Sequence, residues 1–149
     1  MSLIPGFQGD GNLPPGIYWA DWTEVEQRFA YNLQRSRLLQ GFREALMLLH
    51  AAGCKAVFLD GSYVTMKNMP GDFDACWDVT DVDPAMVDPI FFDFANKRAA
   101  QKARFQGEFF PAQLPEGLGG KTFLEFFQID KETGDPKGIV GFNLERWQT

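Results

Sequence analysis

Histidine and cysteine are scarce in this chain of 149 residues, which contains one histidine, His50, and two cysteines, Cys54 and Cys76. The cysteines lack the C-x-x-C spacing of a zinc or redox site, so we interpret both as buried thiols at or within strands. His50 falls near the end of an expected helix, an unfavourable place for a nucleophile–histidine pair. A mechanism that needs a His–Cys or Ser–His pair would have to use this one residue.

Long apolar runs and an excess of positive charge are also missing. No segment approaches the roughly 20 apolar residues that cross a bilayer, and residues 1–5 lack the basic and apolar parts of a secretory signal. We expect a cytoplasmic protein without membrane contact. The net charge of −6 argues against a broad basic face for nucleic acid and still allows a local positive pocket. The length predicts a single domain over residues 1–149.

Fifteen phenylalanines indicate a core built from rings. Residues 1–16 are rich in glycine and proline and are expected to form an irregular N-terminal arm. The Asp21–Glu24 spacing predicts a short helix ending near residue 29. An apolar stripe predicts a helix over residues 34–52, whose arginines at positions 35, 37 and 43 lie off the stripe and are more typical of a solvated face than of a binding surface.

The most informative stretch is an apolar strand at residues 55–59 that enters a Gly61-Ser62 turn and is followed by a second strand over residues 72–78. Asp72 and Asp74 are two positions apart, so their side chains share one face of the second strand, about 6–7 Å apart. Two carboxylates beside a Gly-Ser turn are suited to hold a hard cation next to a phosphate.

Further along, we expect a helix over residues 89–105, a lid-like or partner-binding loop over 108–120, a strand over 122–129 and a returning hairpin strand over 139–144. The helix carries basic residues at positions 97, 98, 102 and 104, either as a solvated face or as a contact for triphosphate or RNA. The predicted fold class is α/β (α+β), with helices packed on a mixed sheet of about four strands.

Gly61, Ser62, Asp72 and Asp74, placed between two strands, resemble the signature of the DNA polymerase β-like nucleotidyltransferase superfamily. The order of the elements extends the resemblance loosely to residues 34–143. Asp60 differs from the pattern, because the superfamily usually has an apolar residue before the glycine.

The resemblance implies transfer of a nucleoside monophosphate from an NTP to a protein, RNA or small-molecule acceptor. Asp72 and Asp74 would hold Mg²⁺, and Gly61 and Ser62 would position the phosphates. Lys67 either reaches the phosphates or is an exposed lysine. The superfamily also has a third carboxylate on a neighbouring strand, and Glu125 is the candidate, with a salt bridge as the competing explanation.

Three interpretations follow. The first is a Mg²⁺-dependent nucleotidyltransferase, in which the N-terminal helices, a homodimer or a partner chain supplies the second wall of the site. The second is a nucleotidyltransferase-like binding or regulatory protein without turnover, such as a component of a bacterial toxin–antitoxin pair, as minimal versions of the fold imply. The third is an unrelated α/β domain whose acidic strand is structural.

Overall fold

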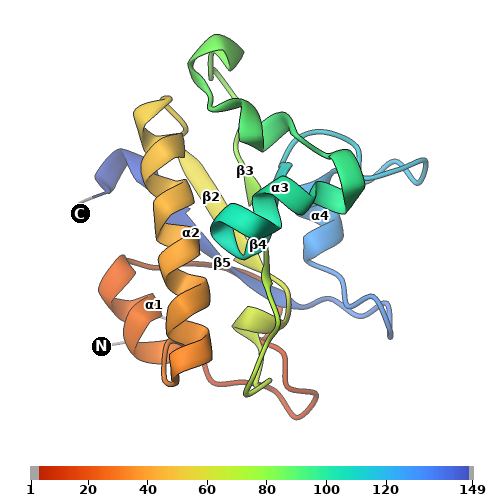
Figure 1. Cartoon of the computed structure of the whole chain (residues 1–149). Helices are drawn as coiled ribbons and strands as arrows, with labels where there is room; N and C mark the ends of the chain where they lie inside the picture. Colours follow the sequence, from red (N-terminus) through yellow and green to blue (C-terminus); the bar gives the residue numbers. More distant parts are fainter. Residues whose placement is uncertain (1–3, 148–149) are drawn as a thin grey trace.

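Five strands form one mixed sheet in a computed structural model of the chain, which describes residues 4–147. Their order across the sheet is β1-β5-β2-β3-β4 (Figure 1). The outer pairs β1–β5 and β3–β4 are parallel, whereas β2 is antiparallel to both neighbours. The strands are β1 Gly16–Trp19, β2 Ala56–Asp60, β3 Phe73–Trp77, β4 Gly107–Pro111 and β5 Gly138–Asn143. The mixed α+β class is confirmed, with five strands in place of about four.

Residues 4–147 also form four α-helices and four 3₁₀ turns, which connect the strands except for the last turn, after β5. The helices are α1 Trp22–Phe29, α2 Leu33–Ala51, α3 Ala95–Phe105 and α4 Phe123–Phe127; the 3₁₀ turns are Ser62–Val64, Pro84–Met86, Pro89–Phe92 and Leu144–Arg146. The first two helices begin where short polar side chains cap them, since Asp21 accepts the Glu24 N–H and Asn32 accepts the Arg35 N–H, each at 2.8 Å. Both helices lie close to their predicted ranges.

The larger core lies between α1, α2, α3 and one face of the sheet (Figure 1). Phe42 of α2 is at its centre, with ring centroids 5.3 Å from Phe73, 6.1 Å from Phe109 and 5.2 Å from Phe142. The contact between α2 and α3 is close enough that a Cβ atom at Gly41 would overlap the Phe105 carbonyl oxygen. The abundant phenylalanines thus form a continuous ring network across the face of the sheet that α1, α2 and α3 cover.

A smaller apolar cluster on the opposite face of the sheet is covered by α4. Strand alternation sends Phe58 and Cys76 to this face while their neighbours enter the larger core. Both cysteines are free and buried, as predicted.

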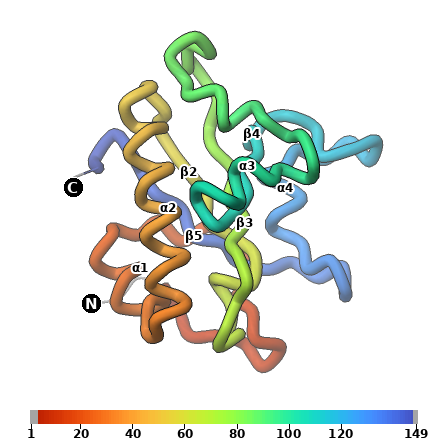
Figure 2. Tube along the Cα trace, viewed as in Figure 1, coloured from red at the N-terminus to blue at the C-terminus, as the bar shows by residue number. Residues whose placement is uncertain are grey.

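The N-terminal arm is docked on the body, because Ile4 and Leu13 are buried in the larger core. It runs beside the loop that follows β2, and the Met66 N–H donates to the Gly11 carbonyl at 3.0 Å (Figure 2). The first three residues of the predicted arm lie outside the described residues, and Gly16 already belongs to β1.

Two expectations about the C-terminal half are wrong. Residues 107–111 form strand β4, beside β3, where a loop was expected from residue 108. The strand predicted over residues 122–129 is helix α4, because Thr122 caps it and Glu125 closes a capping box with Thr122. Consequently β5 does not pair with residues 122–129; it lies between β1 and β2.

Among residues 4–147, no helix has both the length and the apolar character that crossing a membrane requires.

Candidate functional site: a row of carboxylates at one end of the sheet

Three carboxylates from neighbouring strands lie in one row across the sheet. Asp60 of β2 pairs in register with Asp74 of β3, and Asp74 pairs with Glu108 of β4. The neighbouring residues along the strands alternate between the two faces, so all three side chains point to the face that α4 covers. We call Asp60, Asp74 and Glu108 the carboxylate row.

The Gly61-Ser62 turn lies directly against this row. Gly61 has φ of 81° and ψ of −167°, a backbone conformation that residues with a Cβ atom rarely adopt. A Cβ atom at this position would also lie 2.9 Å from Asp74 Oδ2. Glycine is therefore needed both for the turn and for the close approach of the backbone to the Asp74 carboxylate.

The outer members of the row are paired with cations. Asp60 forms an ion pair with Lys137, and both side chains are largely buried, at 6% and 12% exposure. Glu108 accepts from Arg98 Nε at 3.0 Å and lies 2.8 Å from Lys102 Nζ. These contacts neutralise the two ends of the row.

Asp74, in the middle of the row, and the preceding Asp72 have no such partner. Within residues 4–147, neither carboxylate takes part in a hydrogen bond or an ion pair. Burial, and then repulsion from Asp72, Asp60 and Glu108, raises the pKa of Asp74 to about 6. Burial and the nearby Glu108 charge also raise the pKa of Asp72. Both carboxylates would gain from an added cation.

The pKa of Asp60 is set by opposing effects. Burial raises the pKa of Asp60, and the Lys137 ammonium and the Gly61 N–H act in the opposite direction. A carboxylate this deeply buried is tolerated because both a charge and a backbone donor face it.

Two pockets meet at the carboxylate row. The turn pocket has a volume of about 680 Å³ and is lined by the Gly61-Ser62 turn, Lys67 and parts of the N-terminal arm. The ring pocket has a volume of about 340 Å³ and is lined by four phenylalanines of β4 and α4 together with Ile129 and seven charged residues. Both share four charged residues, namely Asp60, Asp74, Lys131 and Lys137.

The loop after Gly61 is fixed by a buried arginine. Arg35 of α2 is fully buried, and its guanidinium donates to the carbonyls of Phe29, Tyr63, Thr65 and Lys67. The expectation that Arg35 belongs to a solvated face is wrong. Its interactions place Ser62 and Lys67 on the wall of the turn pocket.

A short 3₁₀ turn, Ser62–Val64, follows Gly61. Two N–H groups here are used internally, since Val64 donates to the Gly61 carbonyl and Thr65, the residue after the turn, donates to the Ser62 carbonyl. A phosphate here would accordingly depend more on side chains than on a row of free amides.

Glu125 is not brought to Asp72 and Asp74. Its carboxylate is exposed and accepts from the Thr122 N–H at 3.0 Å, and these hydrogen bonds lower its pKa. It lines neither pocket. The carboxylate on the strand next to Asp74 is instead Glu108, in a segment expected to be a loop; the adjacent Phe109 and Phe110, which have high β-propensity, are the local signal for a strand.

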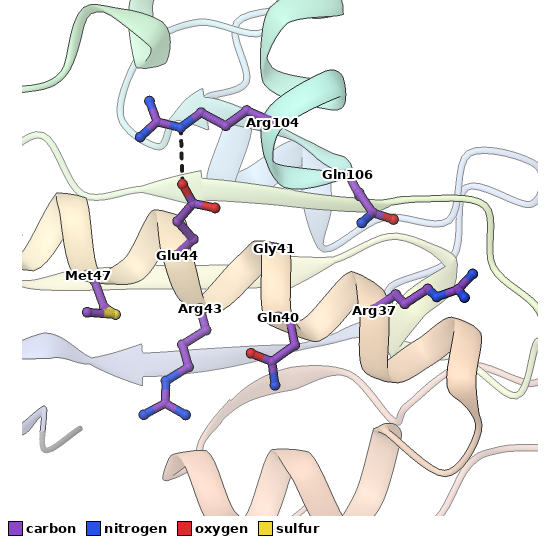
Figure 3. A pocket seen from close by; sticks show the side chains of 8 residues that line it. All are labelled: Arg37, Gln40, Gly41, Arg43, Glu44, Met47, Arg104 and Gln106. Carbon is purple, nitrogen blue, oxygen red and sulfur yellow. Dashed lines mark hydrogen bonds and ion pairs between the residues drawn. The ribbon is translucent and has the colours of Figure 1, made fainter.

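A third pocket lies between α2 and the end of α3 and is lined mainly by arginine and glutamine side chains (Figure 3). Its volume is about 640 Å³, and Arg37 and Arg43 extend away from one another along α2. Arg104 is held by Glu44 at 3.1 Å and by Asp88 at 3.2 Å. The basic cluster expected on α3 is thus divided between two places, because Arg98 and Lys102 pair with Glu108.

In the part of the chain that the structure describes, no group of three or more His, Cys, Asp or Glu side chains has the arrangement of a metal site. Asp72 and Asp74 remain as a pair of oxygen donors. Oxygen donors suit Mg²⁺, which commonly binds through one or two carboxylates and completes its shell with water and phosphate.

The site belongs to a mixed α+β domain in which a glycine turn and a strand carboxylate meet at the end of an open sheet. The chain belongs to the family of unknown function DUF6932, which matches residues 5–143 and so includes every residue of the carboxylate row. Searches of curated proteins and of solved structures gave no match.

Proposed function

We propose that the protein is a Mg²⁺-dependent nucleotidyltransferase that transfers a nucleoside monophosphate from an NTP to a protein, RNA or small-molecule acceptor. The observation that supports this most is the unpartnered Asp74 carboxylate, placed between Asp60 and Glu108 and in contact with the Gly61 turn. A domain with no ligand would not be expected to keep such a carboxylate where its ionisation is opposed by burial.

The charge of the turn pocket supports binding of a metal–phosphate complex rather than a bare phosphate. Five carboxyl groups and three lysines line it: Asp10, Asp60, Asp74, Asp130, Glu132, Lys67, Lys131 and Lys137. A free triphosphate would be repelled by this excess of negative charge. Asp72 and Asp74 would hold Mg²⁺, which would offset phosphate charge and lower the pKa of the attacking hydroxyl.

The chain's own groups would position the phosphates. Lys67 and Lys131 line the same pocket as the Gly61-Ser62 turn. Lys137 is oriented by Asp60, the residue that departs from the superfamily pattern. Positioning and charge neutralisation account for most of the catalysis in phosphoryl transfer, so the absence of a nearby histidine is compatible with this chemistry.

A second candidate is a nucleotidyltransferase-like binding or regulatory protein without turnover, acting with a partner chain, as in a toxin–antitoxin pair. The two ion pairs of Glu108 favour it, because a carboxylate engaged by Arg98 and Lys102 is less available as a metal ligand. Incubation with labelled NTPs and cell extract separates the two candidates: a labelled acceptor supports transfer, and binding without labelling supports the second.

Isothermal titration with ATP, GTP, CTP and UTP, with and without Mg²⁺, tests the shared requirement. The wild type is expected to bind only in the presence of Mg²⁺, and the double variant Asp72→Asn/Asp74→Asn is expected to lose binding and stay folded. The double variant Asp81→Asn/Asp135→Asn removes two exposed carboxylates outside both pockets and is a control of equal charge change. Absence of binding by the wild type would overturn the proposal.

A further inference from the structure

The ring pocket contains one aromatic side chain whose faces are not used by other rings. Phe110 stacks on Phe123 at 4.7 Å between centroids, and Phe127 contacts both rings at 5.7 Å and 6.4 Å. Phe126, on the same short helix, makes no ring–ring contact within residues 4–147. It is half-buried and lines the pocket.

A cation lies over one face of each of two rings in this pocket. Lys131 Nζ is 5.7 Å from the centroid of Phe126, and the Arg98 guanidinium is 4.7 Å from the centroid of Phe110. Aromatic faces with adjacent cations favour planar, electron-rich rings such as nucleobases, which stack on the face and interact with the positive charge.

The ring pocket adjoins the proposed phosphate site, because Asp74 and Lys137 line both pockets. A ligand with phosphates in the turn pocket would therefore have its other end at the mouth of the ring pocket. The ring-pocket volume of 340 Å³ lies within the range typical of small-ligand sites.

We propose that the ring pocket holds the base of the bound nucleotide, with Phe126 as the face on which the base stacks. This inference rests on the proposed function and adds the base subsite to it. Helix α4 then has a defined role, since it brings Phe126 over the face of the sheet that carries the carboxylate row. Stacking on a ring face discriminates weakly between bases, so all four nucleotides should bind, purines more tightly.

The test compares Mg²⁺·ATP with Mg²⁺·tripolyphosphate, which has the phosphates without the base, in isothermal titrations of the full chain. The wild type is expected to bind ATP at least about 10-fold more tightly. Phe126→Leu should lose most of that advantage and leave the affinity for tripolyphosphate unchanged. Phe94→Leu is the matched control, because Phe94 is 42% exposed and lines neither pocket.

Equal wild-type affinity for the two ligands would overturn the base subsite and leave the proposed function standing. Equal weakening of both ligands by Phe126→Leu, or no weakening of either, would also overturn it. Failure of the wild type to bind either ligand with Mg²⁺ would overturn both proposals. The comparison of ATP with tripolyphosphate on the wild type uses no variant, so it tests the base subsite even if Phe126→Leu does not fold.

Discussion

The two faces of the sheet differ in how the same strands are used. On the α2 face, Phe73, Ala75 and Trp77 of β3 enter a large core of rings. On the α4 face, the alternate residue Asp74 is left without a partner beside Gly61. The comparison indicates that packing on the α2 face supplies much of the stability of the fold. That stability allows the α4 face to hold buried, partly unpaired charge.

The largest effect is expected from a change in the α2 face. Phe42→Ala removes a fully buried ring that contacts three others and should lower the free energy of unfolding by about 3–5 kcal/mol. Urea unfolding monitored by circular dichroism measures this loss. An effect below about 1 kcal/mol would show that the larger core is not the main source of stability.

A slightly smaller effect is expected at the ion pair of the α4 face. Lys137→Met leaves the buried Asp60 charge without its cation and should cost about 3 kcal/mol of unfolding free energy. The double variant Asp60→Asn/Lys137→Met should recover most of the loss in the same unfolding assay. If the double variant were as unstable as the single one, packing of the lysine stem rather than charge pairing would explain the effect.

Asp74→Asn should have the opposite sign, because it removes an unfavourable charge. The pKa of Asp74 rises from 3.8 to about 6 on folding, so its contribution to stability is lost as the pH increases from about 4 through 6. Relative to the wild type, the variant should gain about 1–2 kcal/mol of unfolding free energy between pH 4.5 and pH 7.5, allowing for partial solvent screening. Asp135→Asn, an exposed carboxylate outside both pockets, should show no such pH-dependent gain.

The smallest effect concerns the backbone that presents Arg98 to Glu108. Asn96, Lys97 and Arg98 have φ values of 53°, 56° and 61°, a left-handed conformation that costs about 1–2 kcal/mol per residue with a Cβ atom. Lys97→Gly removes the steric cost at this position, because glycine adopts a positive φ without strain. Part of that gain in stability is lost, because glycine also gives the unfolded chain more conformational entropy. The free energy of unfolding, measured by thermal unfolding, is expected to increase by about 0.5 kcal/mol. A clear decrease would contradict the prediction.

Local patterns predicted the elements whose determinants are close in sequence. The apolar stripe of α2, the Asp21 cap of α1 and the strands on either side of the Gly61-Ser62 turn all lie near their predicted positions. Each depends on a period or a cap within a few residues, which is visible without tertiary context.

The remaining features depend on contacts between distant segments. Arg35 is buried only because carbonyls from the loop after β2 surround it, and no local period signals that arrangement. For α4, the high β-propensity of its phenylalanines favours a strand, whereas the Thr122-x-x-Glu125 capping box favours the observed helix. The expected position of Glu125 depended on that strand, and the carboxylate that lies next to Asp74 is Glu108 of β4.

The central claim is that Asp74, beside the Gly61-Ser62 turn, and the nearby Asp72 hold a divalent ion together with a nucleotide. Electron paramagnetic resonance of Mn²⁺, titrated with protein in the presence and absence of ATP, measures that ion directly. We predict ATP-dependent binding of Mn²⁺ by the wild type and by Asp135→Asn, and none by Asp74→Asn. Undiminished Mn²⁺ binding by Asp74→Asn, or no ATP dependence in the wild type, would contradict the account.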